Sequence, residues 1–306
     1  MEMRKVLALE LEKLMIKNEK IVLINADLAK AAGLSGLYSK FPNRCFNVGI
    51  AEQNMASIAA GLSSYGFIPF IFTFTPFATR RICDQIAVSI CYAKQNVKIF
   101  GLDPGIVATS NGGTHMSFED VGIIRSMPKT SIFEPCDEIE LAKSLEQISD
   151  YQYPIYVRMF RKQTTKIFDE NYKFDLLKSY IIKEGSDVSI FCSGIMVEES
   201  LKAFDILSQK GISAEIINVH TVKPLDTVTV LNSLKKTKKA VVAENHNRYG
   251  GLFSAISEFS SENYPVRIKC VAINDEFGQV GNLDYLKKYY GLTADKIVES
   301  TLELVK

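Results

Sequence analysis

Short runs of apolar, β-branched residues alternate with longer segments of helical periodicity along most of this 306-residue sequence. Such alternation is typical of an α/β fold, in which helices cover a mostly parallel sheet. A first series of strands is predicted over 21–27, 45–48, 68–72, 97–102, 131–134 and 154–159. A second series is predicted over 188–192, 214–219, 240–244 and 267–273, followed by a final helix near 294–305. We therefore expect two α/β domains.

The sequence between the two series is charged and polar, most clearly over 162–171. This composition is typical of a connection between domains. We predict a first domain over residues 1–165, a linker over 166–185 and a second domain over 186–306. No internal repeat or heptad array occurs in the sequence, which argues against a solenoid or a coiled coil.

Composition narrows the class of function. The 36 Lys and Arg side chains nearly balance the 35 Asp and Glu side chains. A balanced charge provides no field that attracts nucleic acid or an anionic membrane surface, so we expect neither partner and a small-molecule substrate instead. The six cysteines form no C-x-x-C pair, and no apolar run resembles a signal peptide or a membrane span. These features predict a cytoplasmic protein.

One segment indicates acid–base chemistry: residues 46–55, where a predicted strand leads into a predicted helix. Glu52 is expected at the N-terminus of that helix. The helix dipole there favours the carboxylate, whereas apolar neighbours favour the neutral acid. Acidic residues are also common in a first helical turn for electrostatic reasons alone. The segment by itself therefore leaves both a structural and a catalytic role open for Glu52.

Several motifs occur in a fixed order along nearly the whole chain. They are ADLA at 26–29, GIAEQNM at 49–55, TFTPFAT at 73–79, GTH at 113–115, FED at 118–120, RSMP at 125–128, VKPLD at 222–226, ENH at 244–246 and GGL at 250–252. This ordered set resembles the transketolases and related thiamine-diphosphate enzymes. An ordered set is far more specific than any one motif. The resemblance implies a pyrimidine-binding domain followed by a transketolase C-terminal domain.

The resemblance also implies roles in cofactor binding. The family's glutamate, matched here by Glu52, bonds to N1′ of the aminopyrimidine of thiamine diphosphate and so promotes activation of thiazolium C2. Phe77 matches the aromatic residue that stacks on the pyrimidine, and Phe74 belongs to the same motif. Asp27 matches a residue near the thiazolium ring. From the residues alone, core packing for the phenylalanines and a strand-end cap for Asp27 remain open.

Substrate contacts are implied in the same way. His115 matches a histidine close to substrate hydroxyls, where a neutral imidazole can exchange protons. Arg161 aligns with an arginine that binds the substrate phosphate, although it could also be a surface arginine at the domain junction. Asp103 and Asn111 stand where many members have a substrate-contacting histidine and aspartate, and Ala31 replaces a serine. We therefore expect two-carbon ketol transfer between a ketose and an aldose, with phosphorylated and modified sugars both open.

A motif is missing from the sequence. The family uses Gly-Asp-Gly to bind Mg²⁺ at the cofactor's pyrophosphate, and this chain has no Gly-Asp-Gly. The resemblance therefore implies that this chain is a C-terminal subunit, with Mg²⁺ held by an N-terminal subunit that carries Gly-Asp-Gly, in an α2β2 heterotetramer. Two alternatives remain: the beta subunit of a 2-oxoacid dehydrogenase E1 component, and a noncatalytic partner subunit.

Overall fold

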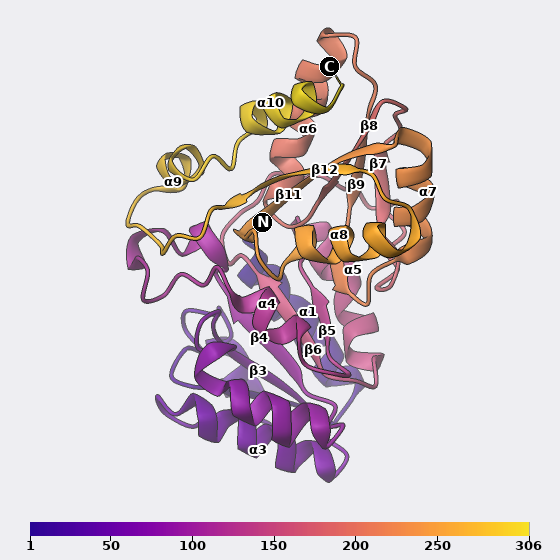
Figure 1. The fold of residues 1–306 in the computed structure, drawn as a ribbon. Coiled ribbons are helices and arrows are strands. Elements are labelled where there is room, and N and C mark those ends of the chain that lie inside the picture. The colour runs from indigo at the N-terminus through magenta and orange to yellow at the C-terminus, as the bar shows by residue number, and fades with distance from the viewer. Residues whose placement is uncertain (306) are drawn as a thin grey trace.

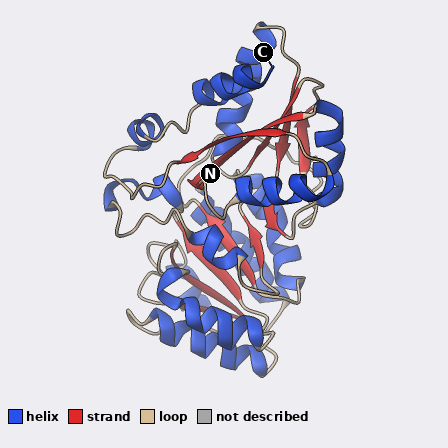
Figure 2. Cartoon of the chain, viewed as in Figure 1, coloured by secondary structure: helices blue, strands red, loops and turns tan. Residues whose placement is uncertain are grey.

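The computed structural model describes residues 1–305. It contains two mostly parallel sheets, each covered by helices on both faces (Figures 1 and 2). This arrangement confirms the predicted fold class. No helix within residues 1–305 has both the length and the apolar character needed to cross a membrane.

The first sheet has seven strands in the order β10-β5-β6-β4-β3-β1-β2. The strands are β1 (Ile21–Asn25), β2 (Cys45–Asn47), β3 (Ile68–Phe74), β4 (Lys98–Leu102), β5 (Ser131–Phe133), β6 (Ile155–Met159) and β10 (Thr221–Lys223). All neighbouring pairs are parallel except β10 with β5. The first six match the predicted strands, with ends that differ by one or two residues.

Helices cover both faces of this sheet because its strands carry apolar side chains on both sides. Along β3, Phe70 and Phe72 point into one core cluster and Ile71 into another, as the two-residue period of a strand requires. The first cluster includes α1 (Met3–Lys17) and α5 (Glu138–Asp150), and the second includes α3 (Glu52–Ser64) and the π-helix η2 (Gln85–Tyr92). The remaining elements of this half are α2 (Ser35–Lys40), η1 (Arg80–Ile82), η3 (Gly105–Asn111) and α4 (Asp120–Arg125).

The second sheet has five strands in the order β12-β11-β8-β9-β7, with β7 antiparallel at one edge. The strands are β7 (Tyr180–Lys183), β8 (Val188–Cys192), β9 (Ala214–Asn218), β11 (Lys239–Asn247) and β12 (Arg267–Ile273). One face packs against α6 (Met196–Gln209) and α10 (Ala294–Val305), and the other against α7 (Thr227–Thr237) and α8 (Leu252–Asn263). A short helix, α9 (Leu283–Tyr289), precedes α10.

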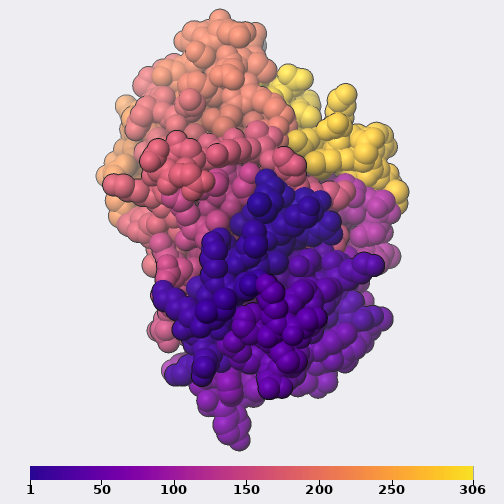
Figure 3. Space-filling model, turned by 180° about the vertical axis from the view of Figure 1, so that it is seen from behind, coloured from indigo at the N-terminus to yellow at the C-terminus, as the bar shows by residue number. Residues whose placement is uncertain are grey.

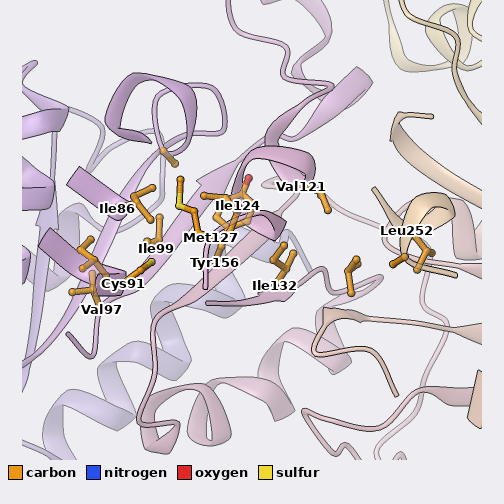
Figure 4. Packing of buried hydrophobic residues seen from close by; sticks show 14 of the residues in the cluster. Ile86, Cys91, Val97, Ile99, Val121, Ile124, Met127, Ile132, Tyr156 and Leu252 are labelled. Carbon is orange, nitrogen blue, oxygen red and sulfur yellow. The ribbon is translucent and has the colours of Figure 1, made fainter. Parts of the chain in front are cut away.

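The two halves of the chain are joined by packing as well as by sequence. One core cluster runs from Ile99 and Tyr156 in the first domain to Leu252 in the second (Figure 4). Seen from behind, the earlier and later parts of the chain form one continuous body (Figure 3). In addition, β10 lies late in the sequence but extends the first sheet. Both β7 and β10 lie outside the predicted strands, because β7 is largely exposed and β10 has only three residues.

A buried arginine binds residues of both domains at their junction. The Arg158 side chain is 1% exposed and donates hydrogen bonds to Asp120 at 2.7 and 3.2 Å and to Glu134 at 2.6 Å. It also donates to the backbone carbonyl of Asn245, on β11 of the second domain, at 2.6 Å. Burial alone would raise the pKa of Asp120, but the adjacent Arg158 lowers it. Burial lowers the pKa of nearby His246 to about 4. The ENH motif therefore contributes to the junction.

Candidate functional site

The candidate site lies at the carboxyl edge of the first sheet. Asp27 follows β1, and Phe74 ends β3. Asp103 follows β4, and Arg161 lies two residues beyond the end of β6. These four strands are neighbours in the order β6-β4-β3-β1, so their ends lie side by side. Open α/β sheets bind ligands outside this edge, which makes it the expected place for a site.

Glu52 is the first residue of α3, where the sequence predicts it. Gly49 turns the chain between β2 and this helix with a φ of +72°, in the region that favours glycine. The Glu52 side chain is 6% exposed, and its Oε1 accepts a hydrogen bond from Nη1 of Arg81 at 2.7 Å. Its Oε2 has no hydrogen-bond partner among residues 1–305. One oxygen of a nearly buried carboxylate is therefore left for a ligand.

An aromatic cluster lies next to this carboxylate. The guanidinium of Arg81 lies over the face of the Phe77 ring, with 3.6 Å between Arg81 Cζ and the ring centroid. Three rings contact one another edge to face. Their centroids are 5.2 Å apart for Phe77 and His115, 6.3 Å for Phe77 and Phe74, and 5.8 Å for Phe74 and His115. The His115 Nδ1 lies 2.8 Å from the Thr114 hydroxyl. The structure thus brings His115 from its loop to both predicted cofactor phenylalanines.

Arg161 and Asp103 form an ion pair at the same edge. Asp103 accepts hydrogen bonds from Nε of Arg161 at 2.7 Å, from Nη2 at 2.5 Å and from the Arg161 backbone N–H at 3.1 Å. Nη1 of Arg161 donates to the carbonyl of Ala31 at 3.1 Å, and Cζ lies 4.9 Å from the Phe74 ring centroid. The arginine therefore joins the aromatic cluster, and part of its donor capacity is used within the protein.

The other two predicted residues lie at the margins. Asp27 pairs with Asn47, whose Oδ1 accepts from the Asp27 backbone N–H at 2.9 Å. Asp27 and Asp103 have φ values of 60° and 54°, a conformation that aspartate tolerates better than most residues and that is frequent at binding edges. Asn111 is exposed at the end of η3. In the part of the chain that the structure describes, no hydrogen bond or ion pair joins Asn111 to the other predicted residues.

Arg81 contacts Glu52 but is not among the residues that the sequence motifs predict for the site. Two arginines, Arg80 and Arg81, directly follow the aromatic motif, but the sequence does not tell which of them points toward Glu52. In the structure, Arg80 pairs with Glu119 at 2.9 Å and donates to the carbonyl of Thr114 at 3.3 Å, while Arg81 pairs with Glu52.

The geometry indicates which ligand group the site can hold. A flat heterocycle with an N–H donor could stack on Phe77 and donate to the free oxygen of Glu52. Residues that can bind an anion or exchange a proton, Arg161 and His115, contact the same aromatic cluster. Within residues 1–305, no group of three His, Cys, Asp or Glu side chains is arranged to hold a metal ion.

Two family profiles match the chain. Residues 1–166 match the profile described as "Transketolase, pyrimidine binding domain". Residues 177–297 match "Transketolase, C-terminal domain". Together the two profiles cover most of the sequence.

Similar proteins cover nearly the same length. The chain is 46% identical over 290 residues to the 6-deoxy-6-sulfo-D-fructose transketolase subunit SqwH of Clostridium sp. (strain MSTE9), covering 95% of this chain and 90% of that protein. It is 37% identical over 294 residues to the putative transketolase C-terminal section of Methanocaldococcus jannaschii, covering 95% and 92%. A solved structure described as "Split gene transketolase, inactive beta4 tetramer" is similar with a TM-score of 0.91 and 35% identity, covering 100% and 98% of the two chains.

Proposed function

The chain belongs to the transketolase family, which depends on thiamine diphosphate, and from this premise we propose that it is the C-terminal subunit of a two-subunit transketolase. The proposed reaction transfers a two-carbon ketol unit from a ketose to an aldose. The observation that carries the proposal is the cluster of Glu52, Phe77 and His115 at the carboxyl edge of the first sheet. It supplies an acid–base group, a stacking ring and a substrate-facing imidazole in one place.

The residues present fit the aminopyrimidine end of the cofactor. When bound, thiamine diphosphate supplies the carbon nucleophile for ketol transfer. Glu52 would hold a proton at N1′ through its free Oε2, and Phe77 would support the pyrimidine ring by stacking. Asp27, two residues beyond the end of β1, would lie toward the thiazolium. The nearly complete burial of Glu52 excludes water from this proton, which strengthens its hydrogen bond.

His115 would act on the sugar. Its ring lies against Phe74 and Phe77, so it is held near the pyrimidine site, and it can exchange protons with substrate hydroxyls as the ketol unit is transferred. Asp103 and Arg161 would bind the substrate near the same rings. Asn111, which is exposed at the end of η3, would contact the acceptor.

We propose that the pyrophosphate and Mg²⁺ are bound by a partner subunit that carries Gly-Asp-Gly, in an α2β2 heterotetramer. Support comes from the lack of this motif in the present sequence and from relatives named as a transketolase subunit and a transketolase C-terminal section. A similar solved chain is described as an inactive beta4 tetramer, which suits a subunit that needs a partner.

We expect the purified chain to fold but to lack ketol-transfer activity, because half of the cofactor site lies on the proposed partner. Adding the partner subunit, which we expect to be encoded by a neighbouring reading frame with Gly-Asp-Gly, should restore activity in the presence of Mg²⁺ and thiamine diphosphate. Steady-state assays on each subunit and on the mixture measure this. Full activity of the isolated chain would refute the two-subunit proposal. An inactive mixture with bound cofactor would instead support a noncatalytic role.

The relatives reported above have transketolase names, so they favour transketolase over the beta subunit of a 2-oxoacid dehydrogenase E1 component. For the substrate, we propose a ketose with a terminal anionic group. Asp103 lies beside Arg161 and would repel a doubly charged phosphate more than a singly charged sulfonate. The relative named for 6-deoxy-6-sulfo-D-fructose makes this sulfonated ketose the first substrate to test.

Arg161→Ala should raise KM for the anionic ketose and lower its kcat/KM by roughly 10- to 150-fold. This range corresponds to the loss of one charge-assisted hydrogen bond, about 1.5–3 kcal/mol. An uncharged ketose should be affected much less, because it never makes this contact. Steady-state kinetics with both sugars on the assembled enzyme measure the difference. Equal losses for the two sugars would show that Arg161 supports the structure through Asp103 and Ala31 and does not bind the anion.

A further inference from the structure

We propose that Arg81 is a positioning residue for the aminopyrimidine site: its guanidinium ties the carboxylate of Glu52 to the ring of Phe77. This inference rests on the proposed function, because it assumes that Glu52 and Phe77 bind the same cofactor ring. The inference comes from its two contacts in the structure.

The first contact sets the orientation of the carboxylate. Nη1 of Arg81 binds Oε1 of Glu52 at 2.7 Å, and no other side chain within residues 1–305 binds this carboxylate. A glutamate side chain has several rotatable bonds, and without a partner it loses rotamer entropy when a ligand fixes it. By binding Oε1, Arg81 fixes these torsions in advance and leaves Oε2 for the N1′ proton.

The second contact sets the position of the ring. The guanidinium carbon of Arg81 lies 3.6 Å from the centroid of Phe77, which is the distance of face-to-face stacking. This stack covers one face of Phe77. Phe74 and His115 contact the same ring edge to face, which further limits its movement.

The two contacts together have a consequence that neither has alone. An aminopyrimidine that stacks on Phe77 and donates to Glu52 requires a fixed distance and angle between the ring and the carboxylate. One rigid, planar group that contacts both can maintain that geometry, because a guanidinium can stack on a ring while its edge N–H groups bind a carboxylate. A Lys side chain could pair with Glu52 but could not stack in the same way.

The neighbouring arginine provides a matched control. Arg80 and Arg81 lie on the same turn, η1, and their side chains are 39% and 42% exposed. Both pair with a glutamate, but Arg80 pairs with Glu119 and its guanidinium has no stacking contact with Phe77. Arg80→Met and Arg81→Met therefore remove the same charge and nearly the same exposed surface from one turn, and only the second removes the link between Glu52 and Phe77.

The test uses the assembled two-subunit enzyme with Mg²⁺. Titration calorimetry gives the Kd of thiamine diphosphate, and hydrogen–deuterium exchange at C2 of the bound cofactor gives the rate of proton transfer. We expect Arg81→Met to weaken cofactor binding by about tenfold and to slow exchange by about tenfold at full occupancy. Arg81→Lys should recover part of the loss. Arg80→Met should change each quantity by about twofold or less.

A double-mutant comparison tests whether Arg81 acts through Glu52. If it does, adding Arg81→Met to Glu52→Gln should slow C2 exchange little beyond the single Glu52 variant, because the carboxylate that Arg81 positions is already absent. Losses that multiply fully in the double variant would overturn the proposal, as would equal effects of Arg80→Met and Arg81→Met. Tighter cofactor binding by Arg81→Met would show that the arginine competes for the site. Absence of cofactor binding by the unmodified complex would instead refute the proposed function.

Discussion

Replacing Glu52 by Gln should slow C2 hydrogen–deuterium exchange of bound thiamine diphosphate by about 10²-fold or more, the usual range for loss of a positioned acid–base group. The carboxamide keeps the size of the side chain, and its oxygen can still accept the hydrogen bond from Arg81. It cannot, however, take up and return the proton at N1′. The measurement is the exchange rate by proton NMR after acid quench of the assembled enzyme, at a cofactor concentration that gives full occupancy.

The control for this prediction is Glu119→Gln. Glu119 also pairs with an arginine of η1 and also carries a carboxylate charge, but it lies outside the aromatic cluster. Its replacement should alter the exchange rate by about twofold or less. An unchanged rate in Glu52→Gln at full cofactor occupancy would exclude Glu52 as the activating group, whatever its position in the structure.

Replacing Arg158 by Met should lower the free energy of unfolding by about 3–5 kcal/mol, because Asp120 and Glu134 would stay buried without a cation. The cost lies mainly in the two uncompensated carboxylates, since a buried ion pair by itself contributes little net stability. The change would also remove the hydrogen bond to the Asn245 carbonyl between the domains. Urea denaturation followed by circular dichroism measures the loss.

Arg125→Met is the matched control for the junction. Arg125 also extends from the first domain to the second, where it pairs with Glu258, but the Glu258 side chain is 61% exposed. Solvent screens this pair, so its loss should cost about 0–1 kcal/mol. If both arginine variants lost the same small amount, burial of the Arg158 network would not determine the stability of the junction.

Much of the fold follows from local patterns in the sequence. Strands buried on both faces, such as β8, appear as continuous apolar runs, and its predicted and observed bounds agree at 188–192. β7 could not be found in this way, because it is an edge strand whose side chains are mostly exposed. β10 forms through pairing with β5, a contact across about ninety residues that no local pattern encodes.

The candidate site was predictable only in part. The position of Glu52 at a helix start follows from the change of period after β2, and the aromatic residues follow from their motif. The pairing of Arg161 with Asp103 is tertiary, since 58 residues separate them. The same limit explains Arg81 and Arg158: each is one of two nearby arginines, and only the packed structure shows which one is turned inward.

The pairing of β10 with β5 also constrains how the protein can be made. Six of the seven strands of the first sheet are complete by Met159, but the last lies at Thr221–Lys223. During synthesis, one edge of β5 has no partner strand until at least 62 further residues, from 160 through 221, have been added. An open edge can pair with another chain, and β5 presents such an edge during this interval. The first domain therefore acquires its final edge only after three strands of the second sheet, β7, β8 and β9, have been translated.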